Sequence, residues 1–250
     1  MAVLSLRFRS DKLKKPTNVN VVLPDPGRMI NKSIKDYRVL YALHGVGEDS
    51  YSILEKTNIA RRIVGRDTIL VLPDGDRSMY QDDYLGQKYF SYLTEELPEY
   101  LSSVLGISRE REKTWICGMS MGGYGAIRAA LLKSENYQGF GSFSGLCDLR
   151  PLAVARLDEM KSDFPFFAPA LTDMGNTPLN PVNLISSTSS SLKGYISTGT
   201  NDDLLICTQL FEKGAKEKNM DWEFSYHPGF GHTWDYWEEE LVHFLDFMER

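Results

Sequence analysis

Short apolar segments alternate with amphipathic ones along most of the chain, and this alternation restricts the possible folds more than any other feature. Four of the later apolar segments are followed by Gly or Pro, which is typical of strands buried on both faces. The alternation predicts an α/β domain with a mainly parallel sheet and helices on both faces. The expected strands are 3–8, 18–23, 38–43, 68–72, 114–117, 139–143, 193–197 and 222–227. The expected helices are 89–105, the segment after Ser120, 203–217 and 233–248.

A length of 250 residues suits one large domain, 1–250. The first two strands are separated by a short basic turn, so we expect them to form an antiparallel hairpin. The segment 145–191 is too long for a simple connection, and its prolines at 165, 169, 178 and 181 exclude a long helix. Its phenylalanines at 164, 166 and 167 make it too apolar for a free loop. It is either a satellite hydrophobic cluster or a small cap that walls a pocket, and its aromatic side chains also leave a homo-oligomer contact open.

Charge and cysteine content exclude several classes of protein. The net charge of −6 disfavours nucleic acid and anionic membranes as partners. The longest apolar runs fall short of the roughly 20 residues that a membrane span requires, and residues 1–15 lack the pattern of a signal peptide. The three cysteines form neither a disulfide framework nor a Cys-x-x-Cys metal pair, and Cys117 lies in an apolar run typical of the core. We therefore expect a cytoplasmic protein.

The stretch Gly118-Met119-Ser120-Met121-Gly122 matches the G-x-S-x-G pattern of a nucleophile elbow. An apolar strand precedes it and a helix rich in small residues follows it, which is the context that the elbow requires. In such a turn the flanking glycines prevent steric clashes, and the serine hydroxyl is exposed above the sheet. We interpret Ser120 as a nucleophile rather than as part of a structural glycine turn.

A serine hydroxyl needs a base, and the base needs an orienting acid. In this kind of fold the order along the chain is Ser, then Asp or Glu, then His. His232 lies in a Gly/Pro-rich loop after the last predicted strand, and we predict that it is the base. Asp202 and Asp203 both follow the preceding strand; we favour Asp202 as the acid, since Asp203 is also suited to capping the next helix.

The other polar residues that follow strands have structural interpretations. His44 precedes the serine and is expected to form hydrogen bonds within its loop. His227 ends a strand, and His243 lies off the apolar stripe of the last helix and is expected to face solvent. Asp74 and Asp76 are expected to be turn residues or part of a pocket wall.

Acyl transfer also requires two hydrogen-bond donors for the oxyanion of the tetrahedral intermediate. The N–H of Met121, directly after the nucleophile, is the first predicted donor. The loop "LHGVGEDS" after the third strand is expected to supply the second, because Gly45 and Gly47 allow its backbone to approach the substrate. We predict the N–H of Val46 as this donor, with Gly45 as the second choice.

Five segments together resemble the esterase D-like branch of the α/β hydrolases: "YALHGVGEDSY", "LPDGDRSMYQD", "YFSYLTEELPEYL", "ICGMSMGGYGAIRAAL" and "GTNDDLL…GFGHTWDYW". The likeness covers nearly the whole chain and is greatest to intracellular tributyrin esterases and the related feruloyl and acetyl esterases. The resemblance implies an α/β-hydrolase fold with eight strands, a Ser120–Asp202–His232 triad, and neither cofactor nor metal. S-formylglutathione hydrolases belong to the same branch. Their oxyanion loop is usually richer and contains a cysteine, whereas the loop of this chain is the shorter "HGVGEDS".

These observations predict a serine carboxylesterase that acts on small esters with a short acyl chain or a feruloyl-type aromatic acid. Three alternatives use the same scaffold. The first is an acyltransferase that excludes water, and the second is a thioesterase similar to S-formylglutathione hydrolase. The third is a binding protein without catalysis, which the complete set of Ser120, Asp202 and His232 argues against.

Overall fold

The computed structural model describes residues 1–25, 32–167, 171–172 and 176–250. Eight strands form one sheet in the order β1-β2-β4-β3-β5-β6-β7-β8. Their bounds lie within two residues of the predicted ones. They are β1 Ala2–Arg9, β2 Pro16–Leu23, β3 Arg38–Leu43, β4 Thr68–Pro73, β5 Thr114–Met119, β6 Gly139–Phe143, β7 Lys193–Gly199 and β8 Glu223–His227.

The direction of the strands confirms both the predicted hairpin and the predicted parallel sheet. β1 pairs with β2 antiparallel, and β2 pairs with β4 antiparallel. All pairings from β4 through β3 and β5 to β8 are parallel. The sheet therefore begins with an antiparallel edge and continues as a doubly wound α/β sheet.

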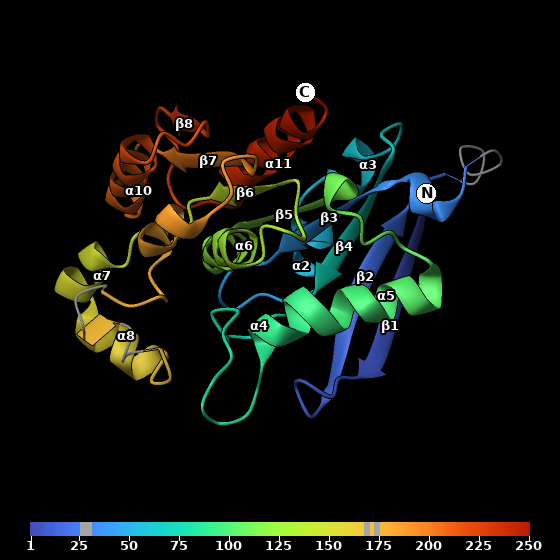
Figure 1. Ribbon diagram of the computed structural model, residues 1–250, viewed down its shortest axis with the longest axis horizontal. Helices are drawn as coiled ribbons and strands as arrows, with labels where there is room; N and C mark the ends of the chain where they lie inside the picture. The colour runs from blue at the N-terminus through green and yellow to red at the C-terminus, as the bar shows by residue number, and fades with distance from the viewer. Residues whose placement is uncertain (26–31, 168–170, 173–175) are drawn as a thin grey trace.

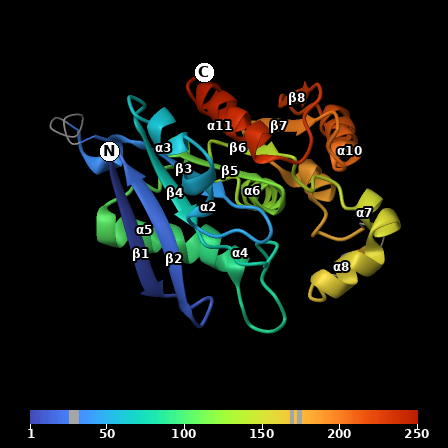
Figure 2. The ribbon, with the colours of Figure 1, turned by 180° about the vertical axis from the view of Figure 1, so that it is seen from behind.

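Helices cover both faces of the sheet, as Figure 1 and the reverse view in Figure 2 show. One face carries α4 Tyr89–Ser91, α5 Leu97–Leu105, α6 Met121–Leu132 and α10 Leu205–Glu217. The other face carries α2 Ser52–Lys56, α3 Ile59–Arg62 and α11 Trp234–Met248. Within the described ranges, no helix has both the length and the apolar character needed to cross a bilayer.

Side chains of the central strands alternate between two separate cores. In β3, Val39 and Tyr41 pack on the face of α6, whereas Leu40 and Ala42 pack on the face of α11. Cys117 of β5 is fully buried in the second core, as predicted for a core residue. Because both faces are covered, these strands have nearly continuous apolar sequences.

The predicted helix 89–105 is not a uniform α-helix, and this part of the prediction was wrong in detail. A π-helical stretch, η2 Tyr92–Glu96, separates α4 from α5. Here the N–H of Leu97 donates to the carbonyl of Tyr92, five residues earlier. The next residue, Pro98, has no N–H to donate and stands in the first turn of α5. The change of hydrogen-bond register accommodates that proline within a continuous helical path.

The described part of the segment 145–191 includes the short helices α7 Arg150–Ala155 and α8 Leu157–Asp163 and the 3₁₀ helix η4 Pro181–Ser187. Figures 1 and 2 both show α7 and α8 at the end of the molecule opposite β1 and β2. Phe167 is buried and packs edge-on against Tyr124 of α6, with 5.5 Å between ring centroids. Phe164 is also buried. Residues 168–170 and 173–175, which include the predicted helix breaker at 169, lie outside the described residues.

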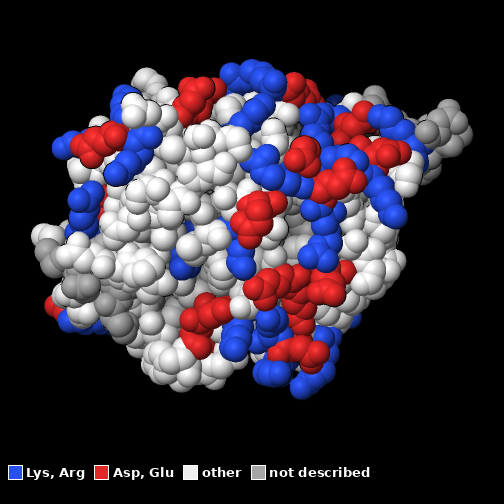
Figure 3. Space-filling view, viewed as in Figure 1, with Lys and Arg blue, Asp and Glu red and all other residues white. Residues whose placement is uncertain are grey.

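The surface in Figure 3 divides into two parts. Acidic and basic side chains are interspersed over the half of this face that carries α5, whereas the area over α6 and η4 is largely uncharged; charged side chains appear again over α10. Ion pairs link several of the charged side chains near α5, among them Lys12 with Glu95 at 2.9 Å. The charge on this face is therefore mixed rather than of one sign.

Candidate active site

The predicted site lies where the sheet reverses its winding. From β3 the chain continues to β4 on one side, while β5 lies on the other side of β3. Loops that leave the carboxyl ends of β3 and β5 therefore diverge, and a crevice opens between them. Ser120 follows β5 directly and precedes the first residue of α6.

Ser120 adopts the backbone conformation of a nucleophile elbow, with φ 55° and ψ −118°. This left-handed region is unfavourable for a residue with a side chain. Two glycines make the turn possible. A Cβ atom on Gly118 would lie 2.4 Å from the backbone of Gly122, and one on Gly122 would lie 2.1 Å from the carbonyl oxygen of Leu43. The strand, the turn and the helix can pack this closely only because both positions lack a side chain.

Three predicted residues from distant parts of the chain form a hydrogen-bonded row. The Nε2 atom of His232 lies 2.9 Å from the Oγ atom of Ser120. The Nδ1 atom of the same ring lies 2.9 Å from Oδ2 of Asp202. Because a carboxylate accepts, Nδ1–H donates to Asp202, and the lone pair of Nε2 is left to accept the serine proton.

Asp202 is held by two hydrogen bonds, one on each carboxylate oxygen. Its Oδ1 atom accepts from the N–H of Leu204 at 2.8 Å, while Oδ2 faces His232. Burial favours the neutral carboxyl, but the surrounding contacts, that with His232 first among them, together outweigh burial and lower the pKa of Asp202. Asp203 points elsewhere: it is exposed and pairs with Arg156 at 2.6 Å. Of the two aspartates, Asp202 therefore contacts the histidine.

The loop that carries His232 is attached to the loop that carries Asp202 by backbone hydrogen bonds. The N–H of Thr200 donates to the carbonyl of His227 at 2.9 Å, and the N–H of Asn201 donates to that of Phe230 at 2.8 Å. The indole of Trp237 packs edge-on against the imidazole of His232, with 4.9 Å between ring centroids. This contact limits rotation of the imidazole, and the sequence pattern of the helix did not predict it.

The two predicted oxyanion donors flank Ser120. Met121 is the first residue of α6, where backbone N–H groups have no partner within the helix. The positive end of the helix dipole lies at the same point. Val46 lines the same pocket as Ser120 and His232. Gly45 runs close by, since a Cβ atom there would lie 3.6 Å from Cβ of Ser120.

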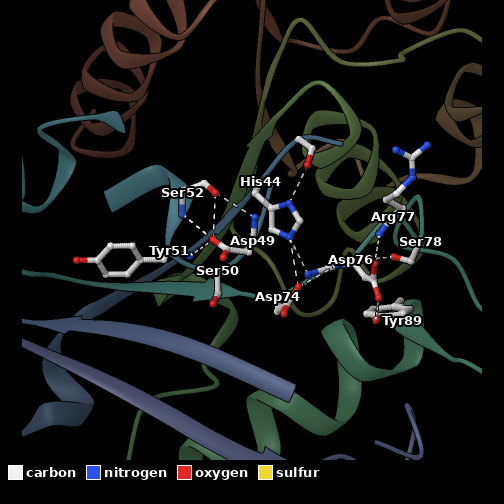
Figure 4. Close-up of polar contacts among 12 residues, drawn as sticks. His44, Asp49, Ser50, Tyr51, Ser52, Asp74, Asp76, Arg77, Ser78 and Tyr89 are labelled. Atoms are coloured by element: carbon white, nitrogen blue, oxygen red, sulfur yellow. Dashed lines mark hydrogen bonds and ion pairs between the residues drawn. The ribbon is translucent and has the colours of Figure 1, made fainter. Parts of the chain in front are cut away.

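His44 fixes the start of the predicted oxyanion loop, as shown in Figure 4. Its Nε2 atom accepts a hydrogen bond from the N–H of Gly75 at 2.8 Å, so Nδ1 carries the proton and donates to the carbonyl of Gly45 at 2.8 Å. The prediction that His44 bonds within its loop is confirmed, and the contact also joins the loops after β3 and β4. Asp74 is a turn residue as expected, because its Oδ1 accepts from the N–H of Asp76.

Asp49 organises the far end of the same predicted oxyanion loop (Figure 4). Its carboxylate accepts from the N–H groups of Tyr51 at 2.8 Å and Ser52 at 3.0 Å. Burial opposes its ionisation, but these hydrogen bonds prevail and lower its pKa. The loop from His44 to Asp49 is thus anchored at both ends by side chains.

A pocket of about 300 Å³ opens beside the hydroxyl of Ser120. Its apolar wall comes largely from the segment 145–191. The residues that line it are Val46, Met79, Ser120, Leu146, Leu152, Arg156, Glu159, Met160, Asp163, Phe164, Asp202, Asp203, Leu204 and His232. Of the phenylalanines at 164, 166 and 167, only Phe164 is among these lining residues. Three carboxylates and one guanidinium stand around the pocket, apart from Asp202.

Strained backbone accompanies the pocket on the side of β4. Met79, which lines the pocket, and Tyr80, which follows it, have φ values of 51° and 48°. Two consecutive left-handed residues other than glycine are energetically unfavourable. The hydroxyl of Tyr80 donates to the carbonyl of His44 at 3.2 Å, and this contact holds the strained turn against the loop that follows β3. Nothing in the sequence pattern around these residues predicted that conformation.

This sheet order, with a serine elbow after β5, an aspartate after β7 and a histidine after β8, is that of an α/β-hydrolase. The chain belongs to the Esterase family: the model of that family, described as "Putative esterase", matches residues 10–248. It is also similar to an acetyl esterase of Caldicellulosiruptor saccharolyticus. The two are 26% identical over 264 residues, which cover 100% of this chain and 99% of the relative. The chain is a carboxylic ester hydrolase.

Solved structures with the same fold include two of related activities. An S-formylglutathione hydrolase of Staphylococcus aureus superimposes with a TM-score of 0.86 at 23% identity, covering 100% of this chain and 99% of the other. A ferulic acid esterase superimposes with a TM-score of 0.84 at 22% identity, covering 99% and 97%. Together with the family match, they confirm the predicted resemblance to esterase D-like α/β hydrolases.

Proposed function

We propose that this chain is a serine carboxylesterase that hydrolyses small uncharged esters through an acyl-enzyme on Ser120. The observation that carries the proposal is the continuous row from Asp202 through His232 to Ser120, with both hydrogen bonds at 2.9 Å. The acetyl esterase relative and the ferulic acid esterase neighbour support the choice of ester as substrate.

In the proposed mechanism the Nε2 atom of His232 accepts the hydroxyl proton as Ser120 Oγ attacks the ester carbonyl. The N–H groups of Met121 and Val46 donate to the oxyanion; the loss of one such donor costs about 3 kcal/mol of transition-state stabilisation. His232 then protonates the leaving alcohol. Water repeats the sequence on the acyl-enzyme and releases the acid. Asp202 keeps the imidazole in the required tautomer and stabilises its charged form.

The pocket lining supports a small apolar acyl group. Leu152, Met160 and Phe164 of the 145–191 segment face the space beside Ser120, and we propose that this segment acts as a cap. A volume of about 300 Å³ suits a short acyl chain or a single aromatic acid.

Charge around the pocket argues against an anionic substrate. Glu159, Asp163 and Asp203 line it, against one arginine, Arg156. That arginine is already paired with Asp203 at 2.6 Å. A glutathione thioester carries carboxylates of its own and would be repelled here, which disfavours the thioesterase alternative.

A panel of esters tests this proposal. We expect p-nitrophenyl acetate, p-nitrophenyl butyrate and methyl ferulate to be hydrolysed. We expect p-nitrophenyl dodecanoate and S-formylglutathione to be much poorer substrates. By the scale of other serine hydrolases, Ser120→Ala should lower kcat/KM at least 10³-fold. Transfer of the acyl group to an added alcohol in preference to water would identify an acyltransferase instead. Binding of these esters without turnover would indicate a non-catalytic protein.

A further inference from the structure

Two histidines and a glutamate form a second cluster behind the loop of the catalytic base. The Oε1 atom of Glu240 lies 3.0 Å from Nε2 of His227 and 2.9 Å from Nδ1 of His243. All three ligand-type atoms lie within 4.8 Å of one another. Glu240 and His243 are one turn apart on α11, and His227 is the last residue of β8. Two imidazole nitrogens from separate elements thus converge on a single carboxylate oxygen.

The charge of Glu240 lacks a permanent counter-ion among the contacts of the described residues. Its side chain is completely buried, and its ion pairs there are with His227 and His243, which are cationic only when protonated. A buried carboxylate is costly unless it is paired with a cation or binds a metal. The hydroxyl of Tyr195 donates to the other oxygen, Oε2, at 3.0 Å and so orients the carboxylate.

The chemistry of this donor set is that of a zinc-type site. Two imidazoles and one glutamate are a common three-residue ligand set for zinc, with water in the fourth position. Ligand bonds of about 2.1 Å in a tetrahedral site place donor atoms about 3.4 Å apart. The present contacts of 2.9 and 3.0 Å must lengthen by about 0.4 to 0.5 Å to admit an ion, and Nε2 of His227 must exchange its 2.9 Å hydrogen bond with Oγ of Ser225 for the metal. Carboxylates that bind a metal usually also accept a hydrogen bond from a neighbouring residue, and Tyr195 donates such a bond to Glu240.

The cluster is accessible from solvent. The side chain of His243 is about half exposed, so the prediction that it faces solvent holds for only part of it. A surface hollow next to it is lined by Asp235, Glu238 and Glu239, together with Arg62. The excess of carboxylates attracts cations toward His243.

We propose that His227, Glu240 and His243 bind a divalent transition-metal ion of the zinc class. The ion joins the end of β8 to α11, the two elements on either side of the loop that carries His232. The ion therefore stabilises the packing of β8 against α11, which hold the two ends of that loop, and it takes no part in the ester chemistry at Ser120. Metal binding raises the melting temperature of the chain, whereas removal of the metal leaves the hydrolytic residues in place.

Titration of the tag-free, chelator-treated chain with Co²⁺ tests the proposal, with visible d–d absorption as the readout. We expect saturable binding of one ion per chain and a rise in Tm of several degrees with either Co²⁺ or Zn²⁺. His243→Ala should weaken Co²⁺ binding by at least ten-fold and abolish the rise in Tm. Tyr195→Phe, which removes only the outer hydrogen bond, should weaken binding by about ten-fold.

Two control variants separate this site from other metal-binding groups. His232→Asn removes the imidazole of the proposed catalytic base, and Glu239→Gln removes a neighbouring carboxylate of α11; each should leave the Co²⁺ affinity within about two-fold. His227→Asn serves as a second ligand variant if His243→Ala fails to fold. Absence of saturable Co²⁺ absorption in the wild type would overturn the proposal. So would undiminished binding in both ligand variants, or loss of binding in His232→Asn.

Discussion

The α-carbon of Gly122 lies so close to Leu43 that a Cβ atom on the glycine would stand 2.1 Å from the leucine carbonyl oxygen. Gly122 belongs to the first turn of α6, and Leu43 ends β3. This contact sets how closely the helix that follows Ser120 approaches the strand that precedes the loop of Val46. The separation between Ser120 and Val46 depends on it.

Gly122→Ala should therefore destabilise the fold, because the obstacle is backbone that cannot move aside. We expect a loss of more than about 3 kcal/mol in the free energy of unfolding, measured by urea denaturation. Gly45→Ala is the matched control, since the nearest atom to its new Cβ would be 3.6 Å away, at Ser120. It should lose less than about 1 kcal/mol. Equal stability of the two variants would show that the close contact does not constrain the fold.

Trp237→Leu should lower activity by releasing the imidazole of His232. The indole packs edge-on against that ring at 4.9 Å between centroids, and aromatic contact limits its rotation. We expect a fall in kcat of about ten-fold with little change in KM, and substantial recovery in Trp237→Phe. The control is Trp234→Leu, which removes a neighbouring indole that packs on Trp237. A change confined to KM would argue against this positioning role.

Phe164→Ala should shift the preference toward longer acyl chains. The ring lines the pocket beside Ser120, and its removal leaves room for further methylene groups. Each methylene newly buried contributes about 0.8 kcal/mol, or roughly four-fold in kcat/KM. Phe166→Ala is the control, because Phe166 contacts Phe164 but is absent from the pocket lining. An unchanged ratio of hexanoate to acetate hydrolysis in Phe164→Ala would contradict the assignment of the acyl pocket.

Asp202→Asn should change both the rate of catalysis and the way in which the free energy of unfolding decreases at acid pH. The pKa of Asp202 is lowered in the folded chain, so its ionised form stabilises the fold above the ordinary carboxyl pKa of about 3.9. This stabilisation is lost as the pH falls through that value toward the lower folded pKa. The variant should show a shallower decrease of the unfolding free energy between about pH 5 and pH 3, measured by urea denaturation.

The catalytic effect of the same change distinguishes the two aspartates. Asp202→Asn should lower kcat at neutral pH by about 10³- to 10⁴-fold, because an amide can stabilise the wrong imidazole tautomer. Asp203→Asn leaves the contact with His232 intact and alters an exposed ion pair with Arg156 at the pocket wall, so it should stay within a few-fold of the wild type. A larger loss from Asp203→Asn than from Asp202→Asn would reverse the assignment.

The sheet and the row of Ser120, Asp202 and His232 could be predicted because their signals are local. A buried strand reads as a short apolar run, and the elbow requires glycines on both sides of Ser120. The chain order of the three residues follows from where parallel strands end. Each of these inferences uses only a few neighbouring residues.

The features that were missed depend on the register between distant segments. The hydrophobic periodicity of the last helix could not show that the ring of Trp237 contacts His232. The left-handed conformations of Met79 and Tyr80 result from packing against the loop of His44 rather than from their own preferences. The proximity of His227 to Glu240 likewise depends on how α11 lies along β8, which no local pattern specifies.

The most direct test of the account is to identify the residue that becomes acylated during turnover. The chain would be mixed with p-nitrophenyl acetate at low pH, quenched with acid within milliseconds to seconds, and digested for mass spectrometry. We predict a burst of p-nitrophenol and an acetyl group on the peptide that contains Ser120, with both absent from Ser120→Ala. An acetyl group on a different residue, or undiminished turnover in Ser120→Ala, would contradict the central claim that Ser120 is the nucleophile.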